Sequence, residues 1–380
     1  MSSLRMPLFL LLSLLATACK PAGPVQAPGG NAAPSAGTGS GAASAAGGSG
    51  PVRIVGAGAT FPYPIYSRWG HAWNEKTKVE VNYQSIGSGG GIKQIKAKTV
   101  DFGASDAPLT ADELQKDGLV QFPMVIGAVV PAINLKGMPD GLSLDGTTLA
   151  AMYLGEIKTW NDPRIAALNP GAALPASAVT PVYRADGSGT TWIFTNYLSK
   201  VSLTWKEKVG NDKTVSWPVG VGGKGNEGVA AYVQRVDGSI GYVEYAYAIQ
   251  NKLAVAKMKN KDGQVVAPSI EAFQAAAASA DWANAPGFYM VLTEQPGATS
   301  WPIAGASFIL MHKDQPDAAK AAGILKFFDF AYRSGADMAK ELHYVPMPAN
   351  VMDLVQKSWD AIRSGAKPVW QAAAAVRTEP

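Results

Sequence analysis

The sequence of 380 residues contains very little cysteine and histidine. Its single cysteine, Cys19, cannot form a disulfide within the chain. The three histidines, His71, His312 and His343, are scattered along the sequence, which argues against a metal site built from histidine and cysteine. We therefore expect neither a metal ion nor another cofactor.

The chain also has little excess charge of either sign. Its 33 lysines and arginines and 29 aspartates and glutamates leave a formal net charge of +4. Two of those bases, Arg5 and Lys20, lie in residues 1–50, which contain no acid, so the remainder is nearly neutral. A protein that neutralises many nucleic-acid phosphates usually has a basic excess gathered in patches, so we expect no nucleic-acid partner.

No apolar run near the N-terminus is long enough to span a membrane, which takes about 20 residues in a helix. Residues 1–18 have one base, Arg5, then an apolar run from Leu8 to Leu15, and then the small residues Ala16-Thr17-Ala18. This layout is typical of an export signal, and we predict that residues 1–18 are a signal peptide.

Cys19 comes directly after those small residues. The segment Leu15-Ala16-Thr17-Ala18-Cys19 resembles a bacterial lipoprotein box, with Ala16 in place of the more usual leucine. Alternatively, Ala16-Thr17-Ala18 is an ordinary signal-peptidase site, and both interpretations cut the same bond. We favour acylation of Cys19, which would anchor the exported protein to a lipid bilayer, in the periplasm or at the cell surface. Residues 19–50, almost wholly proline, alanine, glycine and serine, would then be a lipidated N-terminus and flexible tether.

From Pro51 onward the sequence patterns of strands and helices alternate, and 47% hydrophobic residues are ample for packed cores. Repeated strand–loop–helix units predict an α/β fold with a mostly parallel sheet. Thr110 and Glu113 form a capping box that predicts the start of a helix. We expect strands at Arg53–Val55, Val79–Tyr83, Met124–Ile133 and Phe308–Met311, and helices at Pro62–Thr77, Ile92–Val100, Thr191–Lys200 and Ala318–Arg333.

Hydroxyl side chains recur in glycine-rich loops at the predicted helix starts. Unpaired N–H groups and the positive end of the helix dipole make such a place suitable for an oxyanion. One such loop is usually only a turn or a cap, but this chain has several, and one adjoins Arg184. The loops match neither a dinucleotide fingerprint nor a P-loop, and no serine stands in a G-x-S-x-G elbow. The residues concerned are Thr60, Ser88, Ser188 and Thr190.

These loops strongly resemble those of the phosphate-binding protein of the bacterial phosphate-specific ABC transporter, from about Val52 to about Val351. The motifs are Gly56-Ala57-Gly58-Ala59-Thr60-Phe61-Pro62, Gly87-Ser88-Gly89-Gly90-Gly91, Asp101-Phe102-Gly103-Ala104-Ser105-Asp106 and Arg184-Ala185-Asp186-Gly187-Ser188-Gly189-Thr190. The resemblance implies a two-lobed, type II-like periplasmic-binding-protein fold, an α/β architecture of two sheets flanked by helices with the ligand cleft between the lobes. It places residues 51–128 and 306–380 in lobe I and residues 129–305 in lobe II, with chain crossings near Ala128–Asn134 and Ala304–Ser307.

The same resemblance implies a phosphate site with ligands from both lobes. From lobe I these would be the Thr60 side chain, the Phe61 N–H, Ser88 and Asp106, and from lobe II Arg184, Ser188, the Gly189 N–H and Thr190, with Asp186 orienting Arg184. Hydroxyls and N–H groups donate to phosphate oxygens, and a guanidinium adds a charge-assisted pair. A carboxylate such as that of Asp106 can accept the proton that phosphate keeps near neutral pH. Sulfate has no such proton, so Asp106 would select against it.

We therefore expect a monomeric, non-enzymatic protein that captures inorganic phosphate and delivers it to the membrane subunits of an ABC importer. A different class of function, a secreted phosphatase with Ser88 or Ser188 as nucleophile, would need a base that the sequence does not position. Arsenate is an alternative ligand within the binding class, because it also keeps a proton.

Overall fold

The computed structural model describes residues 53–137 and 141–370. The predicted signal peptide, the lipidation site Cys19 and the tether therefore lie outside the described residues. The described residues belong to a single compact unit. Every helix in residues 53–137 and 141–370 is too short or too polar to span a lipid bilayer.

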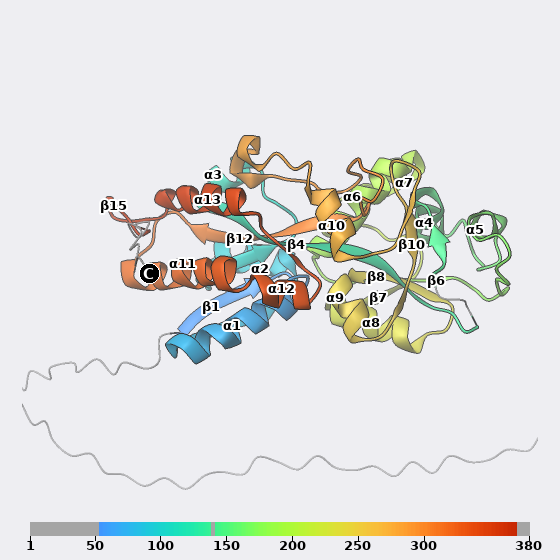
Figure 1. The fold of residues 1–380 in the computed structure, drawn as a ribbon, viewed down its shortest axis with the longest axis horizontal. Helices are drawn as coiled ribbons and strands as arrows, with labels where there is room; N and C mark the ends of the chain where they lie inside the picture. Colours follow the sequence, from blue (N-terminus) through green and yellow to red (C-terminus); the bar gives the residue numbers. More distant parts are fainter. Residues whose placement is uncertain (1–52, 138–140, 371–380) are drawn as a thin grey trace, which may run out of the picture. The chain divides into compact units, whose positions relative to one another are not determined.

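The main structural feature is a ten-stranded sheet (Figure 1). Its strands are ordered β2-β1-β3-β12-β4-β8-β6-β7, and β13 and β9 also pair with β4. The bounds are β1 Arg53–Gly58, β2 Glu80–Ser85, β3 Phe102–Ser105, β4 Leu119–Asn134, β6 Thr180–Arg184, β7 Val221–Gly223, β8 Ser239–Glu244, β9 Ala254–Val255, β12 Ala304–His312 and β13 Val345–Pro346. Short ribbons elsewhere are formed by β5 Ser143–Leu144, β10 Lys257–Lys259, β11 Val265–Val266, β14 Arg363–Ser364 and β15 Lys367–Pro368.

Strand β4 runs through both parts of this sheet. Its first part, Leu119–Ala128, pairs with β12, and its second part, Val129–Asn134, pairs with β8. The two sheets that we expected are therefore parts of one sheet. Nearly every residue of β4 is buried, which confirms that the apolar stretch Met124–Ile133 is a buried strand.

The expectation of a mostly parallel sheet is only partly correct. β2, β1 and β3 are parallel to one another, as are β8, β6 and β7, but β12 is antiparallel to both β3 and β4. β4 and β8 are also antiparallel. Strand–loop–helix units predict parallel neighbours, whereas β12 comes from a distant part of the chain and inserts between β3 and β4, which local sequence patterns do not reveal.

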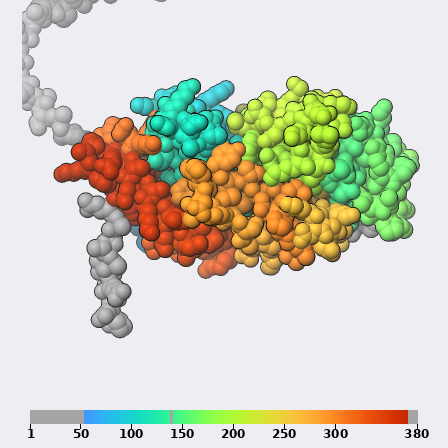
Figure 2. Space-filling view, turned by 90° about the horizontal axis from the view of Figure 1, so that it is seen from above, coloured from blue at the N-terminus to red at the C-terminus, as the bar shows by residue number. Residues whose placement is uncertain are grey.

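The helices surround the two parts of the sheet. In Figure 1, α1 and α11 lie near β1, α13 lies above α11, and α8 and α9 lie beside β8, while α5 lies at the far right beyond α4. In Figure 2, the orange segment around residues 270–300 shares one face with the yellow-green region of α6 and α7. The bounds are α1 Tyr63–Thr77, α2 Ser88–Lys96, α3 Ala111–Asp117, α4 Gly146–Tyr153, α5 Pro163–Leu168, α6 Gly189–Val201, α7 Leu203–Lys208, α8 Gly225–Arg235, α9 Tyr245–Gln250, α10 Ile270–Ala277, α11 Ala318–Ser334, α12 Ala336–Glu341 and α13 Ala349–Ser358.

Most helix predictions agree with the structure, and α2 is the exception. The capping box before α3 is present, since Thr110 Oγ1 accepts from the Glu113 N–H and the Glu113 carboxylate accepts from the Thr110 N–H. Helix α2, expected at Ile92–Val100, instead begins at Ser88 and takes in the glycines that we assigned to a loop. A Cβ at Gly91 would lie 2.5 Å from the Cα of Gly58, so this glycine lets α2 pack directly on β1.

Candidate functional site

The predicted site residues come together where strands of both parts of the sheet end. Thr60 follows β1, Ser88 begins α2 after β2, and Asp106 follows β3. Because these three strands are parallel, their carboxyl ends meet at one edge of the sheet. Arg184 ends β6 on the other side of β4, and α6 begins with Gly189 and Thr190. The polar side chains of this set are all buried, none more than 3% exposed.

Thr60 is held by groups from the opposite part of the sheet. Its Oγ1 accepts hydrogen bonds from the backbone N–H of Asn226 at 3.2 Å and from Asn226 Nδ2 at 2.7 Å. The Tyr247 hydroxyl donates to the Thr60 carbonyl at 2.7 Å. The next residue, Phe61, has a fully buried ring, and the Tyr344 hydroxyl donates to its carbonyl at 2.6 Å. The loop after β1 is therefore fixed on both faces.

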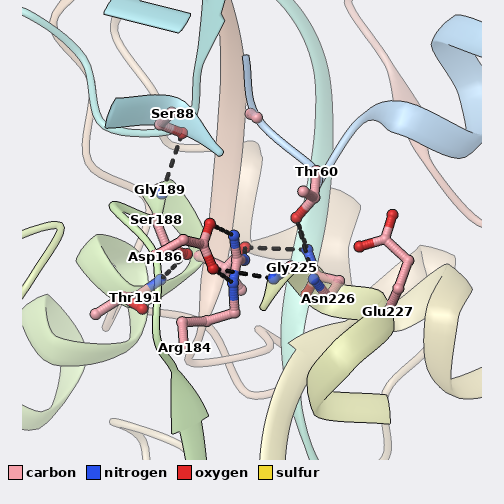
Figure 3. A network of polar contacts seen from close by, with 12 residues as sticks. Thr60, Ser88, Arg184, Asp186, Ser188, Gly189, Thr191, Gly225, Asn226 and Glu227 are labelled. Atoms are coloured by element: carbon pink, nitrogen blue, oxygen red, sulfur yellow. Dashed lines mark hydrogen bonds and ion pairs between the residues drawn. The ribbon is translucent and has the colours of Figure 1, made fainter. Parts of the chain in front are cut away.

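Ser88 and Gly189 meet although they are 101 positions apart in the sequence. Ser88 Oγ accepts from the Gly189 N–H at 3.0 Å and from the Asp106 N–H at 3.2 Å. Figure 3 shows this contact between the start of α2 and the start of α6. A Cβ at Gly189 would lie 2.4 Å from Ser88 Oγ, so only glycine permits the approach. The N–H that we assigned to phosphate is thus bonded to Ser88 in this structure.

Asp106 is a buried carboxyl with one oxygen unused. Its Oδ2 lies 3.5 Å from Ser88 Oγ, and its Oδ1 has no hydrogen-bond partner among the described residues. Burial raises the pKa of Asp106 to about 7, against the opposing effects of the Ser307 hydroxyl, the Arg184 charge and the Ser88 hydroxyl. The group can therefore gain or lose a proton near neutral pH.

Arg184 and Asp186 form the ion pair that we expected. Arg184 Nε donates to Asp186 Oδ1 at 2.8 Å, and Arg184 Nη2 donates to Oδ2 at 2.5 Å. The Gly225 N–H donates to the same Oδ1 at 2.9 Å. Burial alone would raise the pKa of Asp186, but the hydrogen bonds and charge of Arg184 hold that pKa below its ordinary value. The bidentate pair keeps the guanidinium in one orientation (Figure 3).

Ser188 is the N-cap of α6. Its Oγ accepts from the Thr191 N–H at 3.0 Å, as in an ordinary helix cap. A hydroxyl that accepts this bond still has its own proton to donate. The cap and the predicted ligand role are therefore compatible. Thr190, in the first turn of the same helix, accepts from Arg184 Nη1 at 3.2 Å.

The sequence analysis missed several residues that organise the site. Asn226 is fully buried and contacts both Thr60 and Thr190. Glu244 is also fully buried; burial raises its pKa well above the ordinary value, and its Oε2 lies 2.9 Å from the Tyr344 hydroxyl. The signal for Asn226 was a polar residue directly after a glycine turn, at a helix start, as for Ser88 and Thr190.

The described residues show no arrangement for metal binding. None of their histidines, aspartates and glutamates gather in groups of three or more that could hold a metal ion. Among residues 53–137 and 141–370, neither Ser88 nor Ser188 is hydrogen-bonded to a histidine. What the site offers is a set of hydroxyl, amide and guanidinium donors around one carboxyl group, a chemistry suited to an oxyanion that carries a proton.

Comparison with known proteins agrees with this chemistry. The model of the PBP superfamily domain matches residues 36–334. The chain is 55% identical over 323 residues to the phosphate-binding protein PstS of Pasteurella multocida, covering 84% of this chain and 93% of that protein. It is 54% identical over 309 residues to PstS of Haemophilus influenzae, covering 80% of this chain and 92% of the relative.

Solved structures are similar at the level of the fold. A phosphate-binding protein from Stenotrophomonas maltophilia superposes with a TM-score of 0.61 at 21% identity, covering 82% of this chain and 94% of that one. A periplasmic phosphate-binding protein bound with phosphate, PfluDING, gives a TM-score of 0.64 at 22% identity, covering 81% and 94%. The chain therefore has the periplasmic-binding-protein fold.

Proposed function

The chain belongs to the PstS family of phosphate-binding proteins, and on this premise we propose that it captures inorganic phosphate at the site described above and delivers it to an ABC importer. The observation that carries this proposal is the convergence of buried donors from both parts of the sheet on one carboxyl group, Asp106, whose Oδ1 is unused. The donor groups satisfy the oxygens of an anion, and the carboxyl group accepts its proton.

In detail, we assign the phosphate ligands as the sequence predicts. On one side they are the Thr60 hydroxyl, the Phe61 N–H, Ser88 and Asp106. On the other they are Arg184, Ser188, the Gly189 N–H and Thr190. Phosphate would take over the Gly189 N–H that now bonds to Ser88 Oγ, since a charged oxygen is the stronger acceptor.

We further propose that the two parts of the sheet are lobes that close on phosphate, with residues 51–128 and 306–380 in one and 129–305 in the other. This is supported by the pairing of β4, which changes from β12 to β8 between Ala128 and Val129. The second crossing, at Ala304–Ser307, pairs with β4 beside that point. Ligands from both lobes would favour the closed state, as in hinge closure of periplasmic binding proteins.

Calorimetry tests the binding function. The purified chain, freed of bound phosphate, is titrated with orthophosphate and, in parallel, with sulfate. We expect binding at micromolar concentration or tighter for phosphate and none for sulfate. Absence of phosphate binding would overturn the proposal. Arsenate, which keeps a proton as phosphate does, should also bind.

The proposal includes the absence of catalysis. A serine hydrolase usually takes a histidine as its base, and in the described part of the chain neither Ser88 nor Ser188 bonds to a histidine; the group near Ser88 is the Asp106 carboxyl, which we assign to the proton of phosphate. Incubation with a chromogenic phosphate ester should give no turnover above that of the Arg184→Ala variant. The same preparation should elute as a monomer, with its mass measured by light scattering.

Export of the chain follows from its membership of this family, and we propose that acylated Cys19 anchors it to a bilayer. The support is the lipoprotein-box-like segment before Cys19. In cells that export the chain, Cys19→Ser should move the protein from the membrane fraction to the soluble fraction and abolish labelling by a fatty acid. Unchanged fractionation would favour the ordinary signal-peptidase site.

A further inference from the structure

Asn226 lies at the centre of the site without belonging to the predicted ligand set. It is the second residue of α8 and is fully buried. Its side-chain amide lies between Thr60, from the loop after β1, and Thr190, from the first turn of α6 (Figure 3 shows its contact with Thr60). Asn226 thus contacts hydroxyls on both sides of the site.

The orientation of this amide follows from its neighbours. The backbone N–H of Glu244 lies 3.0 Å from Asn226 Oδ1, and a backbone N–H can only donate. The oxygen of the amide must therefore face Glu244, and the nitrogen must face the two threonines. Asn226 Nδ2 then lies 2.7 Å from Thr60 Oγ1 and 3.2 Å from Thr190 Oγ1.

This orientation determines where the hydroxyl protons go. Thr60 Oγ1 accepts from Asn226 Nδ2 and from the Asn226 N–H, and Thr190 Oγ1 accepts from Asn226 Nδ2 and from Arg184 Nη1. A hydroxyl oxygen has two lone pairs, and each of these oxygens has used both. Each hydroxyl is left with one proton to donate, and neither proton has an acceptor among the described residues.

We propose that Asn226 is a positioning residue that makes the Thr60 and Thr190 hydroxyls obligatory donors toward the bound anion. The inference rests on the proposed function, since the acceptor is phosphate. An unconstrained hydroxyl can turn either a lone pair or a proton toward the ligand, and only the proton is attractive to a phosphate oxygen. Asn226 excludes the orientation in which a hydroxyl lone pair faces phosphate. It does so in the ligand-free protein and without contacting phosphate.

Two variants separate this role from simple packing. Asn226→Asp is nearly isosteric and keeps the oxygen that faces Glu244, but it replaces the donor by an acceptor, so both hydroxyl protons would turn away from phosphate. Asn226→Ala removes the donor and leaves a small void. We expect calorimetry with orthophosphate to give a Kd about tenfold higher for Asn226→Ala and a still larger increase for Asn226→Asp. A packing role alone would give the opposite order, with the isosteric variant the milder one. The charge that Asp adds is separated by measuring Asn226→Asp in the Thr60→Val, Thr190→Val background, where repulsion would persist and the effect of misdirected hydroxyls would not.

A mutant cycle tests whether Asn226 changes phosphate affinity through the Thr60 and Thr190 hydroxyls. In the Thr60→Val, Thr190→Val background no hydroxyl remains to be oriented, so Asn226→Ala should change the Kd for phosphate less than twofold. The cycle also carries the test if Asn226→Asp does not fold. A matched control is Asn260→Asp, because Asn260 is a buried asparagine whose Nδ2 lies within 3.2 Å of the carbonyl oxygens of Gly297, Ala298 and Ser300. It should leave the Kd unchanged.

The outcomes are distinguishable. Thermal melts of ligand-free protein first establish that each variant is folded. If the wild-type chain does not bind phosphate, the proposed function fails. If the wild type binds and the Asn226 variants bind equally well, or if the Asn226→Ala effect persists in full in the double-valine background, the positioning role is wrong.

Discussion

The Nε atom of Arg184 lies 2.8 Å from Oδ1 of Asp186, two residues along the chain. A guanidinium has five N–H groups. Asp186 accepts from Nε and Nη2, and Thr190 accepts from Nη1, so one N–H on each terminal nitrogen is left for a ligand. The carboxylate thereby fixes the plane of the guanidinium and the direction of its two free donors.

Asp186→Asn should weaken the fold in a pH-dependent way. The pKa of Asp186 is lower in the folded state than its ordinary value of 3.8, so the pair stabilises the protein above that pH and the contribution is lost as the pH falls through the folded-state pKa. We expect Asn at this position to cost about 1–3 kcal/mol of unfolding free energy at pH 7. Urea unfolding of both proteins from pH 7 to pH 2 measures the difference, which should stay constant down to about pH 4 and shrink as the pH falls further. A difference that does not depend on pH would contradict the assignment.

Asp106→Asn should relax discrimination against sulfate. The wild-type carboxylate accepts a proton from phosphate and repels sulfate, whereas an amide can donate to either anion. The expected result is a measurable Kd for sulfate together with a phosphate Kd at least tenfold higher than that of the wild type. Parallel calorimetric titrations with the two anions test this. Unchanged rejection of sulfate would remove Asp106 from the selectivity argument.

The same carboxyl group predicts the pH dependence of stability in the ligand-free protein. Burial raises the pKa of Asp106 from 3.8 to about 7, so the folded state favours the neutral acid. The associated stability is complete below pH 3.8 and is lost as the pH rises through about 7, by up to about 1.4 kcal/mol per pH unit. Arg184, Glu244 and Tyr66 also face this region: the Arg184 charge opposes the rise in the pKa of Asp106, and the Asp106 charge in turn adds to the raised pKa values of Glu244 and Tyr66.

The comparison variant for this pH dependence is Asp106→Asn, whose amide does not titrate. Without phosphate, its melting temperature relative to that of the wild type should rise as the pH increases from 4 to 8. A constant difference across that range would show that Asp106 ionises at its ordinary pKa.

Gly189→Ala should block the approach of α2 and α6. The added Cβ would lie 2.4 Å from Ser88 Oγ and 2.6 Å from the Asp106 carboxyl group, closer than real atoms come. We expect phosphate affinity to fall by at least tenfold, measured by calorimetry. Gly323→Ala is the matched control, because a Cβ there meets nothing within 4 Å in helix α11. It should keep the affinity and gain about 1 kcal/mol of stability from helix propensity.

Local signals along the chain predicted most helices and the buried strands correctly. Thr110 and Glu113 cap α3 as expected, and α11 covers Ala318–Ser334, against a prediction of Ala318–Arg333. The predicted start of α2 was wrong, because glycine normally disfavours a helix and we therefore assigned the glycines before Ile92 to a loop. Here the close packing of Gly91 against Gly58 in β1 outweighs that preference.

The sequence also predicted some residues of the site and missed others. The polar residues that stand in recognisable loops, such as Ser88 and Arg184, come together as expected. Asn226 was missed because its role depends on the Glu244 N–H, 18 positions further along the chain, which orients its amide. No pattern in the loop Gly222–Asn226 encodes that contact.

The amino-acid sequence by itself predicted most of the helices, the family and a set of phosphate ligands that stays a proposal, because caps, glycine turns and apolar periodicity act over a few neighbouring positions. Long-range packing decided the rest. The insertion of β12 between β3 and β4, the change of partner along β4, the meeting of Ser88 with Gly189 and the raised pKa of Asp106 all depend on segments far apart in the chain. Burial and hydrogen bonding between such segments exist only once the chain has folded.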